Sequence, residues 1–141
     1  MQPIIKVREM AFPRLAAPDL DAMESFLIDF GMVRAQRTSD TLYMRGNGTA
    51  PYVHVVHKGE PAYLGFAFEA ASRSDLDRIA SSEGFSAVEA IDAPGGGWCT
   101  ATRDPNGVRV EVVHGIAPAA PLFTTPPSAA PRLRFSGRSD P

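Results

Sequence analysis

The chain has 141 residues and a formal net charge of −2, which fits a single domain with a core of its own. This charge balance, without a long basic run, excludes a nucleic-acid-binding surface. No apolar stretch approaches the roughly 20 residues that span a bilayer, which argues against a membrane role. The N-terminal sequence does not resemble a signal peptide, so we expect a cytoplasmic protein. The single Cys99 excludes an internal disulfide and is more typical of a buried bystander than of a nucleophile.

The first half of the chain predicts a strand, a helix and three strands. Residues 6–15 suit a strand, and residues 20–30 carry apolar side chains at helical spacing. Asp19 or Asp21 can cap this helix, and Gly31 can end it. Short strands are expected at 33–37, 41–45 and 52–57, with a hairpin turn at Asn47-Gly48 between the last two.

The same order returns in the second half. A strand at 63–69 precedes a helix near 74–82, which Ser72 or Ser74 can cap, and strands follow at 87–92, 98–103 and 108–114. Gly31 and Gly84 are 53 residues apart, which suggests an internal repeat. We therefore predict an α+β fold of two βαβββ modules, at about 6–58 and 62–115. Their helices cover the convex face of a mixed sheet, and the concave face forms a cup.

Residues 116–141 have a different composition, rich in Pro and Ala, with three arginines near the end. This segment is expected either to be a solvated tail or to lie on its own domain or a neighbouring copy.

The last predicted strand carries an acid in its middle. Asp104-Pro105-Asn106-Gly107 predicts the tight turn before it. Strand alternation then places Glu111 on the face opposite Val110 and Val112. Glu111 is either a solvated edge-strand glutamate or a carboxylate that projects into the cup.

Six side chains are candidates for ligand binding in the cup, because aromatic walls with a few polar anchors are typical of small-molecule pockets. They are Phe12, Arg14, Tyr52, His54, Trp98 and Glu111. Packing in the core is the alternative for the aromatic members. Arg14 can pair with a ligand carboxylate or with Glu111. No catalytic residue is assigned.

Several motifs together resemble the vicinal oxygen chelate superfamily, which includes glyoxalase I, bleomycin-resistance proteins and extradiol dioxygenases. These are the doubled βαβββ plan, the segment from Ala17 to Leu27 followed by a Gly, Ala67-Phe68-Glu69, and the Asp104 to Glu111 turn and strand. The likeness covers about residues 7–115 and is strongest to the extradiol dioxygenase branch. The same superfamily implies a homodimer.

The resemblance implies three metal-ligand positions, a His on the first strand, a His, Gln or Glu on the fifth and a Glu on the last. In this chain they fall on Phe12, Gly65 and Glu111. Two of them have no side-chain ligand atom, so the metal triad is incomplete. If a metal binds, His54 with Glu111 is the pair to test first.

Two functions follow from these observations. The first is a cofactor-free protein that binds a small aromatic, catechol-like ligand, with little catalysis by the chain alone. The alternative is an extradiol ring-cleavage dioxygenase that uses Fe(II), or another divalent metal, at a non-standard site including Glu111.

Overall fold

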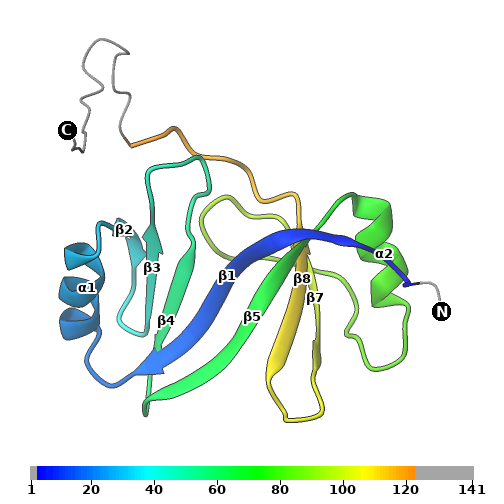
Figure 1. The fold of residues 1–141 in the computed structure, drawn as a ribbon, viewed down its shortest axis with the longest axis horizontal. Coiled ribbons are helices and arrows are strands. Elements are labelled where there is room, and N and C mark those ends of the chain that lie inside the picture. The colour runs from blue at the N-terminus through cyan, green and yellow to red at the C-terminus, as the bar shows by residue number, and fades with distance from the viewer. Residues whose placement is uncertain (1–2, 123–141) are drawn as a thin grey trace, which may run out of the picture.

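The computed structural model describes residues 3–122, which form one mixed sheet of eight strands flanked by two helices (Figure 1). In chain order the elements are β1 (Val7–Ala17), α1 (Leu20–Asp29), β2 (Val33–Arg37), β3 (Thr41–Arg45), β4 (His54–Lys58), β5 (Ala62–Ala70), α2 (Arg73–Ala80), β6 (Glu89–Ala90), β7 (Trp98–Arg103) and β8 (Arg109–His114). The strand order is β2-β3-β4-β1-β5-β8-β7-β6. Each βαβββ module therefore makes one half of the sheet, and the predicted α+β fold is confirmed.

The two modules join through their first strands. β1 pairs antiparallel with β5, and each of these strands pairs in parallel with the last strand of its own module, β4 or β8. Sequence alone left open whether the modules pair within one chain or between two. In the structure they pair within the chain.

Both helices begin at a capping side chain, and a left-handed glycine follows the C-cap of α1. The carboxylate of Asp19 accepts a hydrogen bond from the Ala22 amide at 3.1 Å, and the hydroxyl of Ser72 accepts one from the Asp75 amide at 3.1 Å. Gly31 follows α1 with φ 96°, a conformation that costs glycine little. Of the two predicted cap candidates for each helix, the structure uses Asp19 and Ser72.

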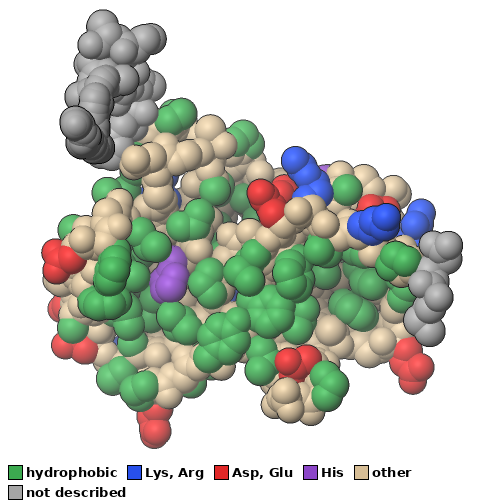
Figure 2. All heavy atoms as spheres, viewed as in Figure 1, with side chains coloured by type: hydrophobic (Ala, Val, Ile, Leu, Met, Phe, Trp, Pro, Cys, Tyr) green, Lys and Arg blue, Asp and Glu red, His purple; other side chains and the backbone are tan. Residues whose placement is uncertain are grey.

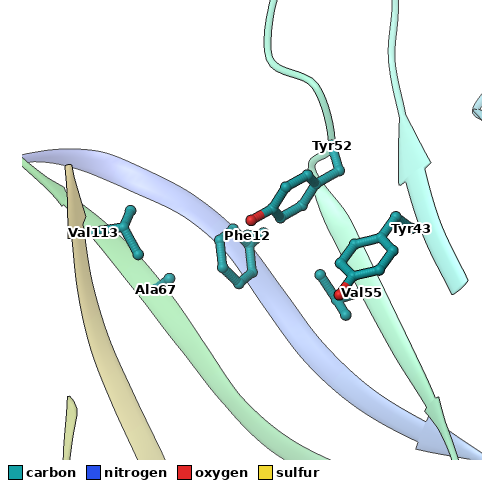
Figure 3. Close-up of a cluster of buried hydrophobic side chains, with 6 residues drawn as sticks. All are labelled: Phe12, Tyr43, Tyr52, Val55, Ala67 and Val113. Carbon is teal, nitrogen blue, oxygen red and sulfur yellow. The ribbon is translucent and has the colours of Figure 1, made fainter. Parts of the chain in front are cut away.

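The helices cover one face of the sheet, and we call the opposite, helix-free side the inner face. Helix α1 packs on the first module through a cluster made of Ala17, Leu20, Leu27, Leu42, Met44 and Val56. Helix α2 packs on the second through Ala70, Leu76, Ile79 and Val112. Between the helices, hydrophobic side chains gather over the middle of the sheet (Figure 2). The inner face carries its own cluster, made of Phe12, Tyr43, Tyr52, Val55, Ala67 and Val113 (Figure 3).

The connection between β3 and β4 differs from the prediction. The two strands pair antiparallel, but β4 begins at His54, so residues 46–53 form a long loop in place of a two-residue turn at Asn47-Gly48. Pro51 lies in this loop, and a proline cannot donate a ladder hydrogen bond. Tyr52 therefore lies on a loop, and strand alternation does not decide which way it points.

The first residues of the predicted tail lie on the domain. The Ala117 amide donates to the Gly95 carbonyl at 2.8 Å, and the Ala119 amide donates to the Thr49 carbonyl at 2.7 Å. Residues 116–122 thus run past the loop at 46–53, and the rest of the predicted tail lies outside the described residues. Within the described part of the chain, neither helix has the length and apolar character needed to cross a membrane.

Candidate ligand-binding site

An ion cluster lies on the inner face around Glu111, whose side chain is 1% exposed. Arg14 of β1 binds this carboxylate with two parallel contacts, Nε to Oε2 at 2.5 Å and Nη2 to Oε1 at 3.2 Å. Arg109 adds a third contact, Nε to Oε2 at 3.3 Å. A bidentate arginine is the strong form of a carboxylate pair. Glu111 is therefore on the predicted face but buried and engaged by two arginines.

The register of the central strands explains how Arg14 reaches across β5. Ala67 of β5 lies opposite Phe12 on one side and opposite Glu111 on the other. Its methyl group fills little of the space between β1 and β8. Gly65, one step along the same face, lies opposite both Arg14 and Arg109. Two small residues on β5 thus leave room for the guanidinium group of Arg14 to contact Glu111.

His57 completes the cluster from β4. Its Nε2 lies 3.0 Å from Nη1 of Arg14, and because a guanidinium can only donate, Nε2 is the acceptor. Burial lowers the pKa of His57, and the charge of Arg14 lowers it further, against an opposing effect of Glu111. Burial opposes the charge on Arg14, but the hydrogen bond and charge of Glu111 raise the pKa of Arg14 overall. The cluster therefore carries charged Arg14, with His57 favoured in its neutral form.

Three aromatic rings, those of Phe12, Tyr43 and Tyr52, lie close together on the inner face (Figure 3). The guanidinium carbon of Arg14 lies 5.0 Å from the ring centroid of Phe12, and the rings of Phe12 and Tyr52 are also 5.0 Å apart. Tyr43 contacts Tyr52 at 5.1 Å. Burial raises the pKa of Tyr52 to about 12, and its buried hydroxyl has no hydrogen-bond partner among the described residues.

A cavity of about 430 Å³ opens at the end of the inner face beyond Phe12 and Tyr52. Strands β1, β5 and β8, the loop at 46–53 and the segment after β8 supply its lining. The lining residues are Glu9, Met10, Ala11, Phe12, Thr49, Ala50, Pro51, Tyr52, Val53, Glu69, Val113, His114, Ile116 and Pro118. Arg14 and Glu111 are not among them. Phe12 lines the cavity and also contacts Arg14 of the ion cluster.

His54 lies on the other face of the sheet from Glu111. Its partner across the β3–β4 pair is Met44, which packs under α1, and residues directly opposite in a pair share a face. Burial lowers the pKa of His54, and its Nε2 has no partner among the described residues. The predicted pairing of His54 with Glu111 is therefore wrong, and His57 is the histidine on the face of Glu111.

Trp98 also lies away from the inner face. Its side chain is on the helix-covered side, where the guanidinium carbon of Arg73 in α2 lies 4.8 Å from the ring centroid, and 41% of Trp98 is exposed. The glycines before it allow a close approach of backbone. A Cβ on Gly97 would lie 2.9 Å from Ile116, so this glycine lets residues 115–117 pass closely.

The three positions that the resemblance assigns to metal ligands do not fit a metal. Phe12 has no donor atom, and a Cβ on Gly65 would lie 2.2 Å from the Arg109 carbonyl oxygen. Glu111, the remaining donor, is already bound by two arginines. Within residues 3–122 no three His, Cys, Asp or Glu side chains are grouped to hold a metal ion.

Comparison with solved structures now places the fold. The Mn(II)-bound glyoxalase from Novosphingobium aromaticivorans matches with a TM-score of 0.76 at 23% identity, over 84% of this chain and 42% of that one. Homoprotocatechuate 2,3-dioxygenase from Brevibacterium fuscum, in complex with 3,4-dihydroxyphenylacetate, matches with a TM-score of 0.73 at 21% identity, over 85% of this chain and 40% of that one. This chain has the glyoxalase and extradiol dioxygenase fold. It spans less than half the length of these neighbours. No family model and no curated protein matches it.

Sequence reasoning missed three residues of this region. His57 shares its face with Val55 by strand alternation, a signal that the predicted strand at 52–57 already contained. Glu9 and Glu69 line the cavity because β1 and β5 pair in one register, and that register is not encoded in either strand alone.

Proposed function

We propose that this chain binds a small aromatic ligand in the cavity beside Phe12 and Tyr52 and that it does so without a metal. The observation that carries the proposal is the replacement of the implied metal triad by Phe12, Gly65 and an arginine-bound Glu111. The cavity supplies what remains of the predicted cup, a volume with aromatic walls and polar groups beside them, as in other small-molecule sites.

Within this proposal the ion cluster holds the aromatic wall of the cavity in place and does not itself contact the ligand. Arg14 covers one side of the Phe12 ring and is fixed by Glu111. Phe12 in turn holds Tyr52 at the cavity wall. Glu111, Arg14 and His57 therefore act as positioning residues behind the wall, and Phe12 and Tyr52 contact the ligand.

Binding of phenol, catechol and 4-ethylphenol to the purified protein tests the proposal, with isothermal titration calorimetry as the readout. Thr49→Trp places a large ring at the cavity mouth and is expected to weaken binding about tenfold. Ala62→Trp is the control. Ala62 is also exposed, but it lies at the end of β5 away from the cavity-lining Glu69, so this variant is expected to bind the phenols as the wild type does. Equal affinities in these two variants would contradict the cavity as the binding site.

The alternative function, an Fe(II)-dependent extradiol dioxygenase, is separated by metal analysis and a ring-cleavage assay. The metal analysis and the ring-cleavage assay are needed because the structural neighbours are a Mn(II)-bound glyoxalase and a homoprotocatechuate 2,3-dioxygenase. Stoichiometric iron, manganese or zinc after dialysis, or a yellow ring-opened product from catechol with Fe(II) under air, would overturn the metal-free proposal.

We also propose a homodimer, since β2 and β6 are the outer strands of the sheet and their outer edges pair with no other strand of residues 3–122. Sedimentation equilibrium of the full chain and of a chain ending at Leu122 tests both the dimer and the part played by the remaining tail.

A further inference from the structure

We propose that the cavity selects an aromatic ligand that carries a positive charge, of the arylalkylamine class. This inference rests on the proposed function, since it names the kind of aromatic molecule that the cavity takes. It follows from the charge of the lining, from two glutamates that are direct cross-strand partners, and from one buried hydroxyl that lacks a partner among the described residues.

The lining of the cavity is acidic. Glu9 and Glu69 both contribute to it, and none of the described residues around the cavity is a lysine or an arginine. The arginines of the ion cluster, Arg14 and Arg109, do not line it. A carboxylate ligand would meet two negative charges there and no fixed positive charge, whereas an ammonium group would be attracted by both.

The two glutamates are direct cross-strand partners. Glu9 of β1 lies opposite Glu69 of β5 in the antiparallel pair, and like charges directly opposite each other destabilise such a pair. Neither carboxylate forms an ion pair with a described side chain. A cation bound between them would relieve this repulsion, which makes the pair a receptor for positive charge.

Tyr52 is the second, independent observation. The residue is 3% exposed, and its hydroxyl has no hydrogen-bond partner among the described residues. Figure 3 shows this hydroxyl pointing toward Phe12, which also lines the cavity. A buried hydroxyl without a partner is costly. A ligand with a phenolic group would supply the missing partner of the Tyr52 hydroxyl. The aromatic rings that line the cavity would also attract an ammonium group of the ligand to their faces.

The inference separates this chain from its structural neighbour. The dioxygenase was crystallised with 3,4-dihydroxyphenylacetate, an aromatic acid. The cavity described here has the opposite charge preference, so we expect it to exclude aromatic acids of this kind and to accept the corresponding amines.

Three phenols of nearly the same shape test the inference: tyramine is a cation at neutral pH, 4-ethylphenol is neutral, and 4-hydroxyphenylacetate is an anion. Their affinities for the full chain are measured by calorimetry at pH 7 and low salt. We expect tyramine to bind roughly five- to tenfold more tightly than 4-ethylphenol, and 4-hydroxyphenylacetate to bind most weakly. Glu69→Gln is expected to remove most of the tyramine advantage, so that the affinities of tyramine and 4-ethylphenol for this variant become nearly equal.

Glu60→Gln is the matched control, because it removes the same charge from an exposed residue just before β5, at the end of that strand away from Glu69. It is expected to keep the tyramine advantage. The inference is overturned if the acid binds as tightly as the amine, or if the amine advantage survives in the Glu9→Gln, Glu69→Gln double variant. Binding of 4-ethylphenol without a preference for the amine would overturn this inference and leave the proposed function standing. Failure of all three phenols to bind would overturn both.

Discussion

Replacing Glu111 with Gln removes the one negative charge that holds two arginines on the inner face. The carboxylate is 1% exposed, and the side chains of Arg14 and Arg109 are 19% and 41% exposed. Removing one partner of a buried ion pair costs roughly 3–5 kcal/mol, because the other charge is left without compensation. Arg109 can regain water and Arg14 keeps its contact with His57, so we expect a loss of about 2–4 kcal/mol in the free energy of unfolding.

Glu24 provides a matched control within the same chain. It is also held by two arginines, Arg34 and Arg37, at 2.8 Å and 2.9 Å. The Arg34 side chain is 53% exposed and can return to water. The Arg37 side chain is 22% exposed but keeps a second carboxylate partner, Asp21, at 2.8 Å. For Glu24→Gln we therefore expect a loss of about 1 kcal/mol.

Urea denaturation followed by circular dichroism measures both losses, and thermal unfolding checks them at about 4 °C per kcal/mol for a domain of this size. The double variant Arg14→Met, Glu111→Leu removes the charges together and is expected to recover most of the stability lost in Glu111→Gln. If Glu111→Gln costs no more than Glu24→Gln, the account of Glu111 as a buried counter-charge is refuted.

Three further predictions follow from the same geometry. Gly65→Ala is expected to destabilise the fold by about 2–4 kcal/mol, because the new Cβ would lie 2.2 Å from the Arg109 carbonyl oxygen. The control is Gly46→Ala, whose Cβ would meet nothing within 4 Å and which is expected to change stability by less than about 1 kcal/mol. The midpoints of denaturant unfolding compare the two variants. Burial raises the pKa of Tyr52 from 10.0 to about 12, so the stability that comes from its neutral hydroxyl is complete below pH 10 and is lost as the pH rises through 12. Between pH 9 and 12 the free energy of unfolding is therefore expected to fall more steeply for the wild type than for Tyr52→Phe. Burial lowers the pKa of His57 from 6.5, so the stability from its neutral ring is present above pH 6.5 and lost as the pH falls below it; His57→Asn is expected to flatten the stability profile between pH 5 and 6.5, and an unchanged slope would contradict the buried neutral ring.

Local patterns were sufficient to predict most of the fold. The alternation around Glu111 correctly placed it opposite Val112, which packs under α2, while Val113 shares its face. Helix caps and left-handed glycines bounded α1 and α2 to within two residues. These signals depend on a few neighbouring residues, so they can be read from the sequence alone. Once both helices pack on one face of the sheet, two βαβββ modules can be arranged in only a few ways, and this is why the fold class could be predicted.

The position of a residue on a face depends on where its strand begins and on where the register of the strand changes. Counting β4 from Tyr52 placed Tyr52 and His54 on one face, but Tyr52 lies on the loop, and His54 lies on the face of its cross-strand partner Met44, which packs under α1. In β1 the register shifts between Met10 and Phe12, so Met10 lies opposite Phe68 while Phe12 lies opposite Ala67. A one-residue change in register sends a side chain to the opposite face, and neither event has a strong local signal.

Two independent obstacles stand between this chain and the metal site that the resemblance implies. One is electrostatic: Arg14 and Arg109 lie within 3.3 Å of the Glu111 carboxylate, so a divalent cation on the same oxygens would be repelled by two guanidinium groups. The other is steric and lies in the backbone, because Gly65 has no space for a side chain of any kind. Substituting His for Phe12 would add one ligand but would leave both obstacles in place. On the inner face the guanidinium of Arg14 therefore takes the place that a metal cation would have beside Glu111. The cavity beside this ion pair can then bind an organic ligand according to the charge and shape of that ligand.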